Sequence, residues 1–85
     1  METLRKKLFF KSHHMGMKET DHIFGAFARE CLPALSGEEL HEYSVLLQNS
    51  DVDLKNWVLG YQDPPPYYNT PLFKKLYSHA QKGRA

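Results

Sequence analysis

The stretch that decides the fold is Ser36-Gly37-Glu38-Glu39-Leu40-His41-Glu42-Tyr43-Ser44-Val45-Leu46-Leu47. Ser36 and Glu39 have the S-x-x-E spacing of a capping box, in which each side chain bonds the backbone N–H of the other at the start of a helix. Beyond the box, apolar residues recur at helical spacing. They are Leu40, Tyr43, Leu46 and Leu47. The stretch therefore predicts an amphipathic helix with one face in a core.

Two more helices are predicted on its C-terminal side. Ser50-Asp51-Val52-Asp53 is typical of a helix N-terminus, because acidic residues there meet the positive end of the helix dipole, and Gly60 is a natural stop. Residues 61–70 form a Pro-rich connection, which we expect to be extended and stiff around Pro64-Pro65-Pro66. Thr70 and Pro71 then begin a last helix over 71–82. The inward positions of these two helices are Leu54, Trp57, Val58, Leu72, Phe73, Leu76, Tyr77 and Ala80.

Two helices are also predicted on the N-terminal side. The first covers roughly residues 3–12, and Gly16 breaks the chain after it. A second apolar periodicity follows and ends at Leu32-Pro33. The inward positions of this pair are Leu4, Leu8, Phe9, Met17, Thr20, Ile23, Phe24, Phe27 and Cys31.

The count of five short helices and no strand predicts an all-α fold, a small five-helix bundle in which residues 1–85 form a single domain. A chain of 85 residues buries only about 60–65% of its unfolded surface, so we expect one modest core. A deep substrate cavity is hard to build at this size. Binding at the surface is the better expectation.

The charge distribution suggests a charged partner. The net charge is +1, but there are six acids and no lysine or arginine from Glu30 to Asp53. The cations gather instead near the two ends, at Arg5, Lys6, Lys7, Lys11, Lys18, Lys74, Lys75, Lys82 and Arg84. Such asymmetry favours a partner surface of complementary charge. The basic ends leave nucleic-acid binding open as an alternative, although the acidic middle and the pI of 7.9 oppose it.

The sequence offers no convincing catalytic or metal site. His13 and His14 are adjacent and would point about 100° apart on a helix, and the other histidines lie on different predicted helices. Cys31 falls on an apolar stripe, which predicts a buried and inert thiol. No Gly-rich phosphate loop is present. We therefore expect no catalytic residue, no metal and no tightly bound cofactor.

Cysteine usage and hydropathy bear on location. A lone cysteine fits a reducing compartment, and no apolar run approaches the roughly 18 residues needed to cross a bilayer. The N-terminal pattern is that of a domain helix rather than of a signal peptide. We expect a cytoplasmic protein with no membrane insertion of its own.

The turn Met15-Gly16-Met17-Lys18-Glu19 is the candidate working surface. Gly16 has no side chain, so the backbone of another protein can approach it closely. Met17 is a flexible apolar contact, and Glu19 lies in the first turn of a helix, where its carboxylate is stabilised. The alternative is a plain linker in which Glu19 serves as a helix cap.

These residues resemble a known family. Gly16-Met17-Lys18-Glu19, followed by Asp21, is similar to the R-G-x-x-E signature of the succinate dehydrogenase flavin assembly factors, which are of the SdhE or YgfY type in bacteria and of the assembly factor 2 type in mitochondria. A second block agrees: Asp51-x-Asp53-Leu54-x-x-Trp57-x-x-Gly60, preceded by Leu46-Leu47. The resemblance is strongest over residues 4–60, and the two blocks together are quite specific.

The resemblance implies a five-helix bundle that binds the flavoprotein subunit of succinate dehydrogenase, or of fumarate reductase in some bacteria. It also implies that the chain promotes covalent attachment of FAD to a histidine of that partner, so that FAD is acted on in the partner. The chain would be a bacterial cytoplasmic protein and a monomer when free. A small regulatory or antitoxin-like binding module is the alternative.

The turn and the resemblance together give the predicted partner-binding set, in which the resemblance implies the roles of Gly16, Glu19 and Asp21. It consists of Met15, Gly16, Met17, Lys18, Glu19 and Asp21, with Lys11 and His14 nearby. Met15 stands where the motif has its arginine, so the charge and the guanidinium fork of that residue are absent. Lys11, His14 or Lys18 could replace it only in part.

Overall fold

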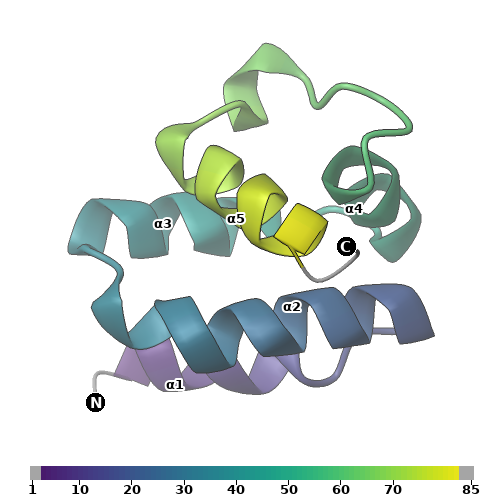
Figure 1. Cartoon of the computed structure of the whole chain (residues 1–85). Coiled ribbons are helices and arrows are strands. Elements are labelled where there is room, and N and C mark those ends of the chain that lie inside the picture. Colours follow the sequence, from purple (N-terminus) through teal and green to yellow (C-terminus); the bar gives the residue numbers. More distant parts are fainter. Residues whose placement is uncertain (1–2, 83–85) are drawn as a thin grey trace.

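The computed structural model describes residues 3–82, which form five α-helices and two short 3-10 helices (Figure 1). They are α1 (Thr3–Ser12), α2 (Lys18–Cys31), η1 (Leu32–Ala34), α3 (Gly37–Leu46), α4 (Asp51–Val58), η2 (Pro66–Tyr68) and α5 (Pro71–Lys82). The expected all-α class is confirmed, with no strand among these residues. Arg84, one of the C-terminal cations, lies outside the described residues. No helix in the described part of the chain combines the length and the apolar character that a membrane span needs.

Short-range side-chain bonds start three of the helices. The capping box is present at α3, where Ser36 Oγ accepts from Glu39 N–H at 3.1 Å and Ser36 N–H donates to Glu39 Oε1 at 2.9 Å. Ser50 Oγ accepts from the N–H of Asp53 at 3.2 Å to start α4, and Thr70 Oγ1 accepts from that of Phe73 at 3.1 Å to start α5. These bonds satisfy N–H groups that a helix leaves without a partner.

The helices form two layers around one core. Figure 1 shows α1 alongside α2 in one layer, with α3, α4 and α5 in the other. The α2 helix packs against α1, α4 and α5, whereas α3 packs against α1 and α5. The side chains that are less than 2% exposed and fill the core include Phe24, Phe27, Leu32, Leu40, Tyr43, Leu54, Val58, Leu72 and Leu76.

Two linked hydrogen bonds at the buried Ser12 lie within the core. Ser12 Oγ donates to the carbonyl of Leu8 at 2.7 Å, and it lies 2.5 Å from the hydroxyl of Tyr43. Because the serine has one hydroxyl proton and uses it on Leu8, the tyrosine hydroxyl donates to Ser12. Burial raises the pKa of Tyr43, so this donor keeps its proton. The bond joins α1 to α3.

Some sequence expectations about burial are wrong. Leu4 and Tyr77 sit at expected core positions, yet they are 40% and 38% exposed. Leu4 lies in the first turn of α1, at the edge of the packed layer, and Tyr77 lines a hollow at the surface of α5. Cys31 is half-buried rather than fully buried. The Pro-rich connection is not extended throughout, because residues 66–68 form the 3-10 helix η2.

Candidate docking site

The turn between α1 and α2 begins at the C-terminal end of α1, where the hydrogen bonds change from the α-helical to the 3-10 pattern. The N–H groups of His13 and His14 bond the carbonyls of Phe10 and Lys11, three residues back, at 3.1 Å each. Both imidazoles also donate from Nδ1 to main-chain carbonyls: His13 to Phe9 at 2.8 Å and His14 to Phe10 at 2.7 Å. A carbonyl can only accept, so Nδ1 carries the proton in both rings. The two histidines therefore cap the helix end.

Two aspartates hold the backbone of the turn. Asp21 Oδ1 accepts from Met15 N–H at 3.2 Å, and Asp51 Oδ2 accepts from Gly16 N–H in a short hydrogen bond. Asp21 lies in the first turn of α2, whereas Asp51 is the first residue of α4. Two consecutive N–H groups are thus fixed by carboxylates from two different helices. We call Met15, Gly16, Asp21 and Asp51 the carboxylate clamp.

The clamp joins the two sequence blocks that the resemblance rests on. Gly16 belongs to the first block and Asp51 to the second, 35 residues later. The sequence indicated Asp51 as an acid that favours a helix start, and its bond to Gly16 was missed. The joint presence of both blocks in one chain was the available signal.

Gly16 has an internal reason to be glycine. A Cβ built on Gly16 would lie 2.5 Å from Asp51 Oδ2, closer than real Cβ contacts. Gly16 is also exposed, so the expected close approach of a partner stays a prediction beside this internal reason. Any larger residue must displace the Asp51 carboxylate, which loosens the clamp.

Glu19 extends from this fixed turn into solvent. It is exposed, and within residues 3–82 its carboxylate has neither a hydrogen bond nor an ion pair. Met17 is the N-cap of α2, with an extended backbone and no side-chain cap bond. Its carbonyl accepts from Asp21 N–H at 2.9 Å and from Thr20 Oγ1 at 3.0 Å. Glu19 therefore makes no capping hydrogen bond, and its carboxylate is available to another molecule.

The remaining members of the predicted set differ in accessibility. Lys11 and Lys18 are exposed, whereas Met15 is half-buried and packs against the core. His14 is exposed, but its ring stacks on Phe10, with centroids 3.9 Å apart and planes at 17°. Met15 thus packs its apolar side chain against the core beneath the turn, at the position where the family motif has an arginine.

Metal binding and nucleophilic catalysis have little support in the described residues. They contain no group of three or more His, Cys, Asp or Glu that could hold a metal ion. His79 pairs with Glu30 across 3.3 Å and lies edge-on to Phe27. Burial and the nearby Glu30 raise the pKa of Cys31, which keeps its thiol protonated and weakly nucleophilic.

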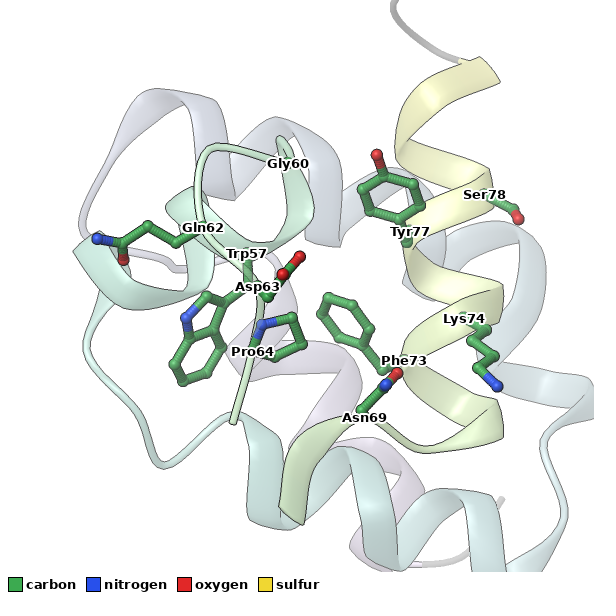
Figure 2. A pocket seen from close by; sticks show the side chains of 10 residues that line it. All are labelled: Trp57, Gly60, Gln62, Asp63, Pro64, Asn69, Phe73, Lys74, Tyr77 and Ser78. Carbon is green, nitrogen blue, oxygen red and sulfur yellow. The ribbon is translucent and has the colours of Figure 1, made fainter. Parts of the chain in front are cut away.

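A hollow of about 560 Å³ lies away from the turn, between the α4–α5 connection and α5 (Figure 2). Figure 2 shows Trp57 and Pro64 on one side of it and Phe73 and Tyr77, from α5, on the other. Its lining includes one carboxylate, Asp63, and one ammonium, Lys74, but no cysteine or histidine. None of the predicted site residues lies in this hollow.

Comparisons with known proteins find similarity over most of the chain. Residues 6–80 match the family model described as flavinator of succinate dehydrogenase. Succinate dehydrogenase assembly factor 2, mitochondrial, of Dictyostelium discoideum is 36% identical over 95% of this chain and 57% of its own length. Its counterpart from Cryptococcus neoformans is 38% identical over 94% of this chain and 46% of its own length. The FAD assembly factor SdhE of Acetobacter pasteurianus is 29% identical over 85% of this chain and 66% of its own length. The chain thus spans about half to two thirds of these relatives.

The comparisons correct the expected location. A bacterial cytoplasmic protein is the wrong expectation, because the similar proteins from Dictyostelium and Cryptococcus are named as mitochondrial. The error has a physical reason. A lone cysteine and the lack of a long apolar run indicate a reducing, aqueous compartment, and they do not distinguish one such compartment from another.

Proposed function

Since this chain belongs to the family described as flavinator of succinate dehydrogenase, we propose that it docks on the flavoprotein subunit of succinate dehydrogenase and promotes covalent attachment of FAD to that subunit. The chain acts as an assembly factor rather than as an enzyme. Its relatives are named as mitochondrial assembly factors and as an FAD assembly factor, which supports the proposal. The flavoprotein of fumarate reductase is a second candidate partner.

One observation carries the choice of docking surface. Glu19 is a carboxylate without a polar partner in residues 3–82, and it projects from a turn whose backbone is held at Met15 and Gly16. A fixed backbone loses little conformational freedom when a partner binds, so more of the contact energy appears as affinity. The proposed contact set is Gly16, Met17, Lys18 and Glu19, with Lys11 and His14 at its edge. Met15 and Asp21 support the turn from beneath.

The proposed mechanism needs no catalytic group in this chain. FAD and the acceptor histidine both belong to the flavoprotein, so the chain needs only to bind the conformation in which they are aligned more tightly than other conformations. A preference of about 1.4 kcal/mol shifts that population tenfold. The free chain is a monomer, holds no cofactor tightly and inserts into no membrane by itself in this proposal.

A flavinylation assay tests the function. Purified apo-flavoprotein is incubated with FAD, with and without this chain, and covalent flavin is measured by its fluorescence on a denaturing gel. We expect faster or more complete attachment with the chain. Equal rates and yields in the two reactions would refute the proposed function.

Glu19→Ala tests the docking surface, with Glu38→Ala as a matched control. Glu19 and Glu38 are each the second residue of a helix, both are exposed, and both lack a polar partner among residues 3–82. Each loses a similar helix-end interaction of about 0.5 kcal/mol when replaced. We expect only Glu19→Ala to weaken binding of the flavoprotein, measured by titration calorimetry. Equal affinities of the two variants would place the interface elsewhere.

A further inference from the structure

A hollow of about 450 Å³ lies on the outer side of α1, where that helix leads into the docking turn. The side chains that line it recur at helical spacing, and they are Lys6, Phe9, Phe10, His13 and His14. Leu8 and Ser12 are the buried residues of the same helix, and neither lines the hollow. Apolar side chains therefore occur on two sides of α1, and only one of these sides is covered by other helices. We call this feature the α1 hollow.

The α1 hollow is open to another molecule. Phe10 is 64% exposed, and Lys6 and His14 are exposed as well. Phe9 and His13 are half-buried, and Phe9 packs against the core. A phenylalanine ring in contact with water still holds the free energy that its burial would release, so it favours association with an apolar group.

The rings of the hollow are held in place before any partner arrives. The ring of Phe10 stacks on that of His14, and the ring of Phe9 lies against that of His13, with centroids 4.5 Å apart and planes at 37°. Each imidazole is also fixed by its Nδ1 bond to the carbonyl of the same phenylalanine. Little ordering is therefore needed when an apolar group enters, which favours binding.

The charge around the hollow is positive. Lys6 supplies an ammonium group, and no acidic residue from the described part of the chain lines the hollow. Residues Thr3–Ser12 contain no Asp or Glu, and Lys6, Lys7 and Lys11 are all exposed. An apolar hollow in a basic surface is complementary to an apolar side chain that has acidic neighbours.

The hollow borders the docking turn. His14 lines it and also belongs to the proposed contact set, and the next residue, Met15, has its N–H held by Asp21. Stable protein interfaces involve about 20–30 residues on each side, far more than the turn supplies. A partner that contacts the turn must therefore cover adjoining surface as well, and phenylalanine is among the residue types enriched in interfaces.

We propose that the α1 hollow continues the docking surface and receives an apolar side chain from an acidic segment of the docked flavoprotein. The identity of this partner rests on the proposed function. Nucleobases also stack on exposed aromatic rings, but Glu19 and the carboxylates of Asp21 and Asp51 at the adjoining turn would repel a phosphate backbone. A protein segment is therefore the favoured occupant.

Phe10→Ala is the decisive variant, and Tyr61→Ala is its matched control. Tyr61 is an aromatic residue of nearly equal exposure, 63%, in the α4–α5 connection. We expect Phe10→Ala to weaken flavoprotein binding about tenfold in titration calorimetry, with no effect of Tyr61→Ala. Both free variants should keep the melting temperature of wild type, because both side chains are largely in water. Wild-type affinity of Phe10→Ala would overturn the proposal.

Phe10→Leu separates contact with the partner from support of His14. Leucine keeps an apolar surface in the hollow but cannot stack on the imidazole. We therefore expect Phe10→Leu to bind the flavoprotein only about twofold to threefold more weakly than wild type. Equal losses for leucine and alanine would mean that Phe10 only positions His14, which would overturn the proposal.

Lys6→Ala tests the charge at the hollow, with Lys7→Ala as its control. Both lysines are exposed on α1, but Lys7 does not line the hollow. We expect Lys6→Ala to bind about threefold more weakly at physiological salt, and this difference should shrink at high salt because an ion pair is screened. Lys7→Ala should bind as wild type does. Equal losses for the two variants would indicate diffuse attraction and overturn the acidic segment as the occupant.

Two further measurements on the chain alone test other occupants. Sedimentation of the wild-type chain should show a monomer, and self-association that Phe10→Ala abolishes would assign the hollow to a second copy. A labelled single-stranded oligonucleotide should show no change of fluorescence anisotropy at physiological salt. Binding that Phe10→Ala abolishes would assign the hollow to nucleobases. Either result would overturn the proposal.

The outcomes separate this proposal from the function on which it rests. If wild type accelerates flavin attachment and Phe10→Ala binds the flavoprotein normally, only this inference fails. If wild type does not bind the flavoprotein at all, both fail, because the occupant is part of that protein.

Discussion

The α1–α2 turn and the α4–α5 connection solve the same problem, joining two packed helices, by different physical means. The turn is held by hydrogen bonds, because Asp21 and Asp51 accept from two consecutive N–H groups. The connection has main-chain hydrogen bonds but, within residues 3–82, no carboxylate bond of this kind, and it is held in addition by proline geometry and by the stack of Tyr68 on Trp57. Hydrogen bonds fix a backbone and leave side chains free, whereas stacking fixes rings. The first region therefore presents a backbone edge with a carboxylate, and the second presents aromatic rings.

Trp57→Ala should have the largest effect, because it removes the ring on which the connection rests. Trp57 is buried, so we expect a loss of about 3–5 kcal/mol in the free energy of unfolding, measured by urea denaturation. Trp57→Phe keeps an aromatic surface for Tyr68 and should cost clearly less. Similar losses for the two variants would show that an aromatic surface stacked on Tyr68 does not hold the connection.

Asp51→Ala should have the next largest effect, because it opens the clamp at Gly16. We expect a loss of about 1 kcal/mol in stability and weaker flavoprotein binding. Asp53→Ala is the control, since Asp53 also lies in the first turn of α4 but is exposed and holds no N–H group of the turn. If the two variants bind the flavoprotein equally well, the clamp does not shape the docking surface.

Gly16→Ala sharpens the comparison through a double-mutant cycle with Asp51→Ala. In wild type, the new Cβ must push the Asp51 carboxylate aside, which we expect to cost about 0.5–1 kcal/mol of stability. In the Asp51→Ala background that contact is absent, so the same change should cost nothing or stabilise slightly. Additive losses in calorimetric or urea unfolding would mean that the two residues are not coupled.

Glu39→Gln should have the smallest effect and depends on pH. The hydrogen bond from Lys75, followed by that from Ser36 N–H, lowers the pKa of Glu39. A lowered pKa stabilises the fold above the usual value of 4.5, and this contribution disappears as pH falls through the pKa of the folded state. Because Lys75 is well exposed, we expect no more than about 0.5 kcal/mol at pH 7.

Urea unfolding at pH 7 and pH 3 measures this difference. Glutamine retains the capping box, so the variant isolates the link from α3 to α5. The gap between wild type and variant should close at pH 3. A gap of the same size at both values would exclude the ion pair as its source.

Local chemistry made most of the fold predictable. The starts of α3, α4 and α5 depend on Ser36, Ser50 and Thr70, each of which bonds an N–H group three residues ahead. The burial of residues at the edges of a helix's apolar face was less predictable, because it depends on which other helix packs against that face. Leu4 and Tyr77 continue apolar stripes, but no helix covers them fully.

The site was predictable only in part, because its support is long-range. Gly16 and Glu19 could be singled out from their own neighbourhood in the sequence. The bond from Gly16 to Asp51 spans 35 residues and depends on how α4 packs against α2. The hollow between Trp57 and Tyr77 depends on the path of residues 59–70, where proline predicts stiffness but gives no direction. Such features require the assembled fold.

The position of Trp57 gives the molecule an optical probe of its own. It is the sole tryptophan of the chain, and the centroid of its ring lies 5.5 Å from that of Tyr68 in the connection. Its emission spectrum therefore reports the seating of the α4–α5 connection without any label. The docking turn has no tryptophan or tyrosine of its own. A change of fluorescence on addition of a non-fluorescent partner would reveal movement at the far connection and not at the turn.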